Sequence, residues 1–216
     1  ALLIGATRMD ENLSFKNLSI YKSSSLKVIA DGIYNILSNR RFLLYVLTYM
    51  FSMGVLFTNI ASAPFLMQEH YGLSTLHFSI VFGFNALTFA IAAALISKFK
   101  DNDAAIRFGT FALAGFSVLT AVVLFFKPGY EILVFILMLM VGIVSTASNV
   151  SAMDSGRDNA GVASALLGAI GYAFGGIVPA IAGMGDMFIT TGALFLCSSL
   201  FTLVCVLISL AGKKSA

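Results

Sequence analysis

Six apolar stretches, each about as long as a bilayer is thick, constrain this chain more than any other feature. They are Phe42–Met67, Ser74–Ser97, Phe108–Phe126, Tyr130–Met153, Ala160–Gly183 and Met187–Ala211. An α-helix needs about 20 apolar residues to cross a hydrocarbon core of about 30 Å. Because lipid offers the backbone no hydrogen-bond partner, we expect helices here and not open strands.

The composition excludes a soluble domain. Of 216 residues, 59% are hydrophobic and 11% are charged, whereas soluble domains carry about 25% charged residues. A soluble core of this size cannot bury so much apolar surface. The chain is therefore predicted to be an all-α integral membrane protein, a bundle of six transmembrane helices.

The basic residues predict the orientation of the bundle. If the six stretches cross in alternation, Lys127 lies on one side and the other 12 of the 13 Lys and Arg residues lie on the opposite side. Positive charge stays on the cytoplasmic face of a membrane. Both ends of the chain are therefore predicted to be cytoplasmic.

The chain divides into three predicted parts. Residues 1–41 are expected to hold the end of a preceding helix, a polar linker and an interfacial segment, residues 42–211 the bundle, and residues 212–216 a cytoplasmic tail. The first residue is not Met, which suggests a piece of a longer chain. Leu26–Leu37 has apolar residues at helical spacing beside Lys27 and Arg40, which is typical of an amphipathic helix on the inner membrane surface. An ordinary linker helix without lipid contact is the alternative.

Three asparagines in three different stretches are candidates for a substrate pathway. They are Asn59, Asn85 and Asn149. Polar side chains at membrane depth usually face the interior of a bundle, and an amide has four hydrogen-bonding positions to satisfy. The alternative is that they only join neighbouring helices, at about 0.6 kcal/mol each.

The fifth stretch is unusually rich in small residues. Its helix-packing and kink candidates are Gly161, Gly168, Gly171, Gly175 and Pro179. Glycines let a neighbouring helix approach closely, and proline removes a backbone hydrogen bond and kinks a helix. This pattern suits a helix that rocks during a transport cycle, although static packing alone also explains the glycines.

A short turn follows the fourth stretch and holds Asp154 and Arg157. The two residues are candidates for a cytoplasmic latch, a salt bridge that holds one conformation and breaks in another. The alternative is a solvated loop, because exposed ion pairs contribute only about 0–1 kcal/mol.

Signals for an enzyme are missing from the sequence. There is no GxxxxGK[ST], HExxH or GxSxG pattern and no buried carboxylate pair. Glu69, His70 and His77 are close in sequence, but the chain has no other His to complete a metal site. We therefore expect no enzyme activity, no cofactor, no metal and no nucleic-acid partner.

Two segments carry a resemblance to a known family. Ala160–Gly168, with the sequence AGVASALLG, resembles the penultimate helix of the Bcr/CflA drug-resistance branch of the major facilitator superfamily. The first outer loop is similar to that branch as well, in Ala63-Pro64-Phe65, Tyr71-Gly72, His77-Phe78 and then Asn85.

The resemblance implies a twelve-helix proton-coupled exporter of drugs or small amphipathic molecules, with this chain as its C-terminal six-helix half. In that family the first, second, fourth and fifth helices of this half supply most cavity-facing positions. This adds Tyr172 to the three asparagines as a pathway candidate. The partners implied are an N-terminal six-helix bundle of the same protein, the lipid bilayer, a small-molecule substrate and protons.

The sequence departs from this branch at two positions. Family members commonly have Thr where this chain has Val162 and often Gln where it has Gly171. The second change removes a polar cavity contact. No acid lies well inside any of the membrane stretches, so protons would bind carboxylates in the N-terminal half. Two other functions fit these residues: an importer or facilitator of a small nutrient on the same fold, and a non-transporting membrane interaction module.

Overall fold

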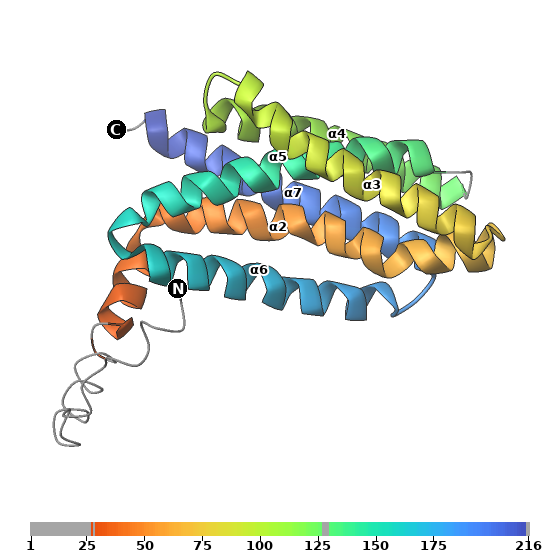
Figure 1. Cartoon of the computed structure of the whole chain (residues 1–216), viewed down its shortest axis with the longest axis horizontal. Helices are drawn as coiled ribbons and strands as arrows, with labels where there is room; N and C mark the ends of the chain where they lie inside the picture. Colours follow the sequence, from red (N-terminus) through yellow and green to blue (C-terminus); the bar gives the residue numbers. More distant parts are fainter. Residues whose placement is uncertain (1–26, 28, 127–129, 215–216) are drawn as a thin grey trace, which may run out of the picture.

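A computed structural model describes residues 27, 29–126 and 130–214. Within these residues six long apolar helices form a bundle and no strand is present, as the sequence predicts (Figure 1). The helices are α2 (Arg40–Pro64), α3 (Thr75–Leu95), α4 (Asn102–Phe126), α5 (Glu131–Ser155), α6 (Ala160–Ala182) and α7 (Met187–Lys214). The predicted N-terminal linker lies outside the described residues.

Two helix boundaries differ from the apolar stretches. The third helix of the bundle, α4, begins at Asn102 and not at Phe108. The carboxylate of Asp101 accepts a 2.6 Å hydrogen bond from the Ala104 amide and so caps a polar first turn. The α-helical part of α2 ends at Pro64, and the chain continues as a π-helix over Phe65–His70. The first membrane-spanning helix is therefore 31 residues long.

The alternating helices bring the start of α2, the α3–α4 turn, the α5–α6 turn and the end of α7 to one end of the bundle (Figure 1). We call this the basic end, because the described turns and helix starts there carry Arg40, Arg41, Lys98, Lys100, Arg107 and Arg157. The α2–α3 and α6–α7 turns lie at the opposite end.

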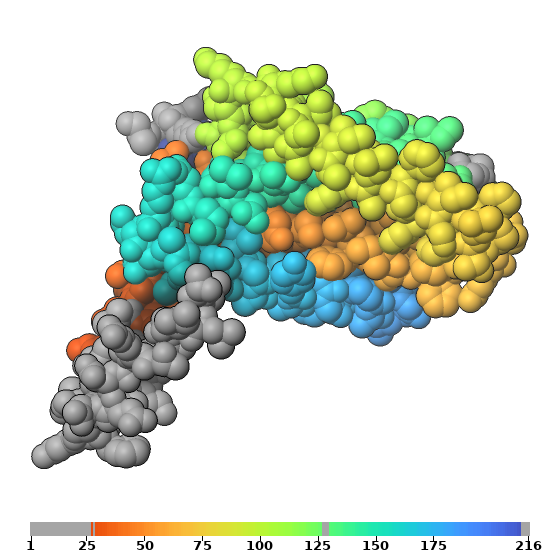
Figure 2. Space-filling model, in the orientation of Figure 1, coloured from red at the N-terminus to blue at the C-terminus, as the bar shows by residue number. Residues whose placement is uncertain are grey.

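Four helices form a closed ring, and two helices attach to its sides. In the ring α2 packs on α5, α5 on α4, α4 on α7, and α7 on α2. Outside the ring, α3 packs mainly on α5 and α6 mainly on α2. Figure 2 shows the resulting face, with α3 and α6 at its margins and parts of α2 and α5 between them. We call it the open face.

The helix contacts are symmetric between the first three helices and the last three: each main contact has a counterpart when the helices of one triplet are replaced by those of the other. Replacing α2, α3 and α4 by α5, α6 and α7 converts the contact of α3 with α5 into that of α6 with α2. The same exchange converts the contact of α2 with α7 into that of α5 with α4. The two triplets run in opposite directions through the bundle. This is the arrangement of an inverted three-helix repeat.

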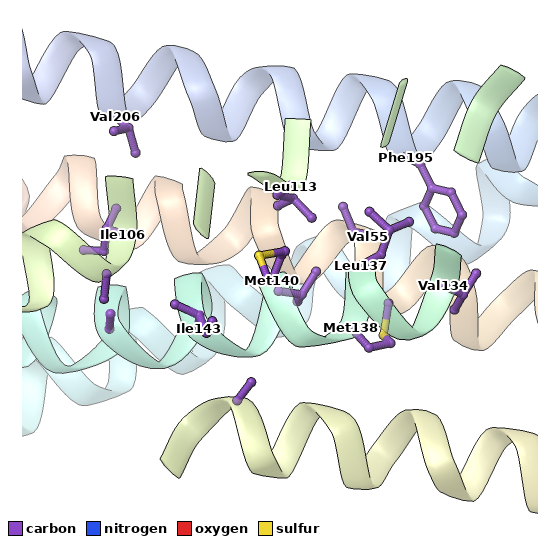
Figure 3. Close-up of a cluster of buried hydrophobic side chains, with 14 of the residues drawn as sticks. Val55, Ile106, Leu113, Val134, Leu137, Met138, Met140, Ile143, Phe195 and Val206 are labelled. Carbon is purple, nitrogen blue, oxygen red and sulfur yellow. The ribbon is translucent and has the colours of Figure 1, made fainter. Parts of the chain in front are cut away.

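The core lies around α5. Figure 3 shows Leu137 and Met140 of α5 among side chains from the other ring helices, including Val55, Leu113 and Phe195. All of these residues are buried. Because lipid is as apolar as these side chains, tight packing and not water exclusion holds the ring together.

Residues 29–38 are helical and lie against the α5–α6 turn. Ile36 is buried, and its Cδ1 atom lies 3.2 Å from the position of a Cβ on Gly156. The other apolar residues of this short helix, Ile29, Ile33 and Leu37, are exposed. The described part of the predicted amphipathic helix therefore has one exposed apolar stripe.

Candidate functional site

A hollow of about 380 Å³ opens on the open face of the bundle. Its walls come from α2, α3 and α5, and they consist of Tyr49, Met53, Phe89, Ser145, Thr146, Asn149 and Val150. We call it the inner hollow. Two aromatic rings, a thioether and the Val150 side chain are its apolar groups, and one amide and three hydroxyls, those of Tyr49, Ser145 and Thr146, are its polar groups. Mostly apolar walls with a few polar groups are typical of sites for small organic molecules.

A second, more polar hollow of about 520 Å³ lies at the basic end. The lining residues are Asn39, Arg41, Tyr45, Asp101, Asn102, Asp103, Val150, Ser151, Asp154 and Ser155. Val150 lines both hollows and is half exposed. The inner hollow therefore adjoins, at Val150, the polar hollow of the basic end.

The structure brings only one of the three predicted asparagines into the inner hollow. Asn149 lines it, near the end of α5. Asn85 is 3% exposed, on the helix that packs on α5, and neither of its amide atoms has a hydrogen-bond partner among the described residues. Asn59 is 2% exposed, and its Oδ1 atom likewise has no partner there.

Tyr172, the fourth pathway candidate, lies outside the lining of the inner hollow. Its side chain is 70% exposed on α6. Its ring lies edge-on to that of Phe57 on α2, with 6.5 Å between the ring centroids. The structure therefore places Tyr172 on the α6 margin of the bundle.

The glycines of α6 fall into two groups. Gly171 and Gly175 are buried against α2, where they face the rings of Tyr49 and Phe57. Side-chain rings, and not a helix backbone, thus fill the space that these two glycines leave. Gly161 and Gly168 have no neighbour within 4 Å of a Cβ position. Pro179 lies inside α6, close to its end at Ala182.

The Asp154–Arg157 pair is formed, with 2.7 Å between an Arg157 guanidinium nitrogen and Oδ1 of Asp154. Both side chains are largely exposed, at 81% for Arg157 and 63% for Asp154. Water screens such a pair strongly, so its contribution to stability is at most about 1 kcal/mol.

The aromatic and aliphatic wall residues of the inner hollow were not candidates from the sequence: Tyr49, Met53, Phe89 and Val150. Aromatic and Met side chains are common throughout membrane helices, so their types alone do not mark a site. One signal was present. Tyr49 and Met53 are four residues apart, which puts them on one face of a helix.

Comparison with known proteins decides the family. Residues 11–180 match the family model described as Major Facilitator Superfamily. The chain belongs to this superfamily. The match includes α2 to α5 and most of α6, and so it contains every wall of the inner hollow.

A curated relative supports the same assignment. The chain is 30% identical over 192 residues to a protein of Bacillus subtilis (strain 168) named "Uncharacterized MFS-type transporter YdgK". The aligned region covers 86% of this chain and 47% of the relative. The chain thus spans about half the length of the curated relative that it matches. No solved structure matches the chain.

Membership of the major facilitator superfamily places the chain in a superfamily of membrane transporters. Six helices of the described chain are long and apolar enough to cross a membrane, as expected for a multi-pass membrane protein. The six apolar helices, the inverted repeat and the hollow on the open face agree with this assignment.

Proposed function

We propose that this chain is the C-terminal half of a twelve-helix exporter of the Bcr/CflA type in a bacterial inner membrane. It carries drugs or other small amphipathic molecules outward in exchange for protons. The observation that carries the proposal is the inner hollow, whose walls combine rings, a thioether, hydroxyls and an amide. The apolar body of an amphipathic molecule would pack on the rings of Tyr49 and Phe89, and its polar group would hydrogen-bond to the amide of Asn149.

The open face supports the presence of a second bundle. The inner hollow has walls on α2, α3 and α5 but opens on the remaining side. On the α6 margin, Gly161, Gly168 and Gly176 have no neighbour within 4 Å of a Cβ position. A flat glycine surface allows another helix to approach closely. An N-terminal six-helix bundle packed on this face would close the hollow into a central cavity.

The positions of the acids bear on proton coupling. No carboxylate lines the inner hollow. Three acids, Asp101, Asp103 and Asp154, line the polar hollow at the basic end. We therefore assign the proton-binding carboxylates to the N-terminal half.

Asn59 and Asn85 fit pathway positions that are closed in this structure and open during transport. Both side chains are buried. Both amide atoms of Asn85 and the amide oxygen of Asn59 lack a hydrogen-bond partner among the described residues, which costs free energy. A water molecule or a polar group of the cargo that reaches them would supply the missing hydrogen bonds. We propose that they become accessible when α3 and α6 move relative to the ring.

The turn at the basic end fits a weak latch. The Asp154–Arg157 pair is exposed and therefore breaks at little cost. Pro179 and the glycines of α6 fit a helix that changes its tilt on α2. In this proposal α6 rocks while the four-helix ring stays packed.

Accumulation of fluorescent drugs in cells tests the export proposal. Cells that express the complete transporter should accumulate less drug than cells without it, and a protonophore should abolish the difference. Asn149→Leu should weaken export, because it removes the amide of the inner hollow. Asn35→Leu is the matched control, since Asn35 is exposed and lies outside both hollows.

The outcomes separate the alternatives. A rise in accumulation with the transporter would favour an importer or facilitator on the same fold. If a broad panel of compounds shows no change, drug export must be withdrawn, and equal loss of export in the Asn149 and Asn35 variants would remove Asn149 from the pathway.

Asn85→Leu tests the buried amides. Leucine has a similar volume and needs no hydrogen bond, so the variant should be as stable as the parent or more stable by about 1 kcal/mol. If Asn85 meets cargo or water during transport, export should nevertheless fall. Unchanged export with raised stability would show that Asn85 has only a packing role.

A further inference from the structure

The ring of Tyr49 belongs to two surfaces at once. On one side it forms part of the wall of the inner hollow. On the other side it lies against Gly171 of α6, which is buried. The ring thus separates the hollow from α6.

The contact with Gly171 leaves no room for a side chain on that residue. A Cβ at position 171 would lie 2.6 Å from Cε1 of Tyr49, 3.4 Å from Cδ1 and 3.6 Å from Cζ. Carbon atoms that are not bonded prefer a separation of about 3.5–4.0 Å. Any residue larger than glycine must therefore displace the ring.

The direction of that displacement follows from the surroundings. A side chain on Gly171 would push the ring away from α6, and the open space beside the ring is the inner hollow. We infer that Gly171 determines the size of the inner hollow: it gives the ring of Tyr49 a resting place on α6 and so keeps the ring out of the cargo space. Gly171 is therefore a specificity-determining residue, although it does not itself line the hollow.

This inference rests on the proposed function in one respect, because the hollow must hold the cargo. The consequence for transport is a size limit. With glycine at position 171 the hollow accepts bulky amphipathic molecules, and with a larger residue it accepts only small ones.

Two other glycines of α6 provide contrasts. Gly175 faces the ring of Phe57, which does not line the inner hollow, so a side chain there disturbs α6 packing without filling the hollow. Gly168 has nothing within 4 Å of its Cβ position, so a side chain there meets no neighbour in this bundle. Only Gly171 combines a close ring with a wall of the hollow.

Reaction of an introduced thiol measures the free space directly. In the complete transporter, with its native cysteines replaced, Met53→Cys places a thiol in the hollow wall. The rates of its reaction with a small methanethiosulfonate and with a bulky fluorescent maleimide are then compared. The ratio of the two rates reports the size of the hollow and depends on neither cargo nor transport.

We expect Gly171→Leu to lower the ratio of bulky to small reagent by about tenfold, and the milder Gly171→Ala to lower it by about threefold, as overpacking by a displaced ring would do. Adding Tyr49→Ala to either variant should restore the ratio. Gly175→Ala should leave it within about twofold of the parent.

An unchanged ratio in both Gly171 variants would overturn the inference, and so would failure of Tyr49→Ala to restore it. If Gly171→Leu does not fold, Gly171→Ala with and without Tyr49→Ala decides alone. Because the labelling ratio does not involve export, it separates this inference from the proposed function. If the parent exports drugs but the Gly171 variants do not change the labelling ratio, only the role of Gly171 is rejected. If the labelling ratio changes as expected but the parent exports no drug, only the proposed drug cargo is rejected.

Discussion

The phenolic hydroxyl of Tyr45 on α2 donates a 2.8 Å hydrogen bond to Oδ1 of Asp103 in the first turn of α4. The bond joins two ring helices at the basic end, and the Tyr45 side chain is buried. Hydrogen bonds to charged acceptors contribute about 1.5–3 kcal/mol.

We therefore expect Tyr45→Phe to lower the free energy of unfolding by about 1–2 kcal/mol, as measured by denaturant titration in detergent micelles. Tyr34→Phe is the control, because Tyr34 is exposed on the short helix. Equal stability of the Tyr45 variant and the parent would mean that the hydrogen bond between α2 and α4 adds nothing to the stability of the bundle.

A substitution at Gly142 should loosen the attachment of α3. A Cβ there would lie 2.5 Å from Cβ of Ala92 and 2.8 Å from the backbone oxygen of Phe89, and backbone cannot swing aside as a ring can. Gly142→Ala should therefore destabilise the bundle by about 1–3 kcal/mol.

The matched control is Gly83→Ala, since Gly83 lies on α3 with nothing within 4 Å of its Cβ position. It should be neutral or slightly stabilising, because alanine favours helix by up to about 1 kcal/mol over glycine. Similar losses at both positions would show that the close approach of α3 and α5 is not the cause.

Tyr130 predicts a response to alkaline pH. It is 1% exposed, at the start of α5, and its hydroxyl has no partner among the described residues. Burial, and then the neighbouring carboxylate of Glu131, raise the pKa of the Tyr130 phenol above its ordinary value of about 10.

A raised pKa in the folded state means that the unfolded chain loses this proton first as pH rises. Stability is then complete below about pH 10 and falls above it, by up to about 1.4 kcal/mol per pH unit until the folded pKa is reached. Tyr130→Phe should flatten the fall and, by removing an unpaired hydroxyl, be neutral or stabilising at pH 7. Unfolding at several pH values checks this, and the same steep fall in the variant would contradict it.

Asn39 should matter more than Arg157 for holding the α5–α6 turn. The Asn39 side chain accepts hydrogen bonds from the Arg41 and Phe42 amides at the start of α2. Its Nδ2 atom also donates a 2.9 Å bond to the carbonyl oxygen of Ser155. Arg157 makes only its exposed pair with Asp154 among the salt bridges described.

Asn39→Ala should therefore cost about 1–2 kcal/mol, the usual effect of a lost helix cap, and Arg157→Ala at most about 0.5 kcal/mol. Thermal unfolding of both variants in one detergent gives the comparison. A larger loss for Arg157→Ala would make the latch, and not the cap, the main restraint on the turn.

The sequence predicts the six helices because lipid leaves a chain few other options. Hydropathy reports the apolar part of a helix and not its full length, which is why α4 begins at Asn102 and not at Phe108. Its polar first turn is helical because Asp101 caps it and Tyr45 pairs with Asp103. Both contacts come from neighbours that hydropathy does not consider.

The site could be predicted only in part. Asn149, Asn85 and Asn59 look alike in the sequence, since each is an amide within an apolar stretch. Tertiary packing then turns Asn149 toward the inner hollow and buries the other two. The sequence does not predict that Tyr49 and Phe89 line the hollow, because an aromatic residue in a membrane helix looks the same in the sequence whether its ring faces lipid, core or cargo.

The contact pattern of α3 also bears on how the protein is made. The ribosome completes α3 before α4 and α5, yet α3 packs mainly on α5. Until α5 is inserted, the face of α3 that carries Asn85 has no protein to cover it, and its amide is open to lipid or to the insertion machinery. By contrast, α6 emerges after its main neighbour α2. The two outer helices therefore differ during biogenesis, because α3 is made before its main neighbour and α6 after it. A chaperone of membrane insertion has more uncovered helix surface to bind in the first triplet than in the second.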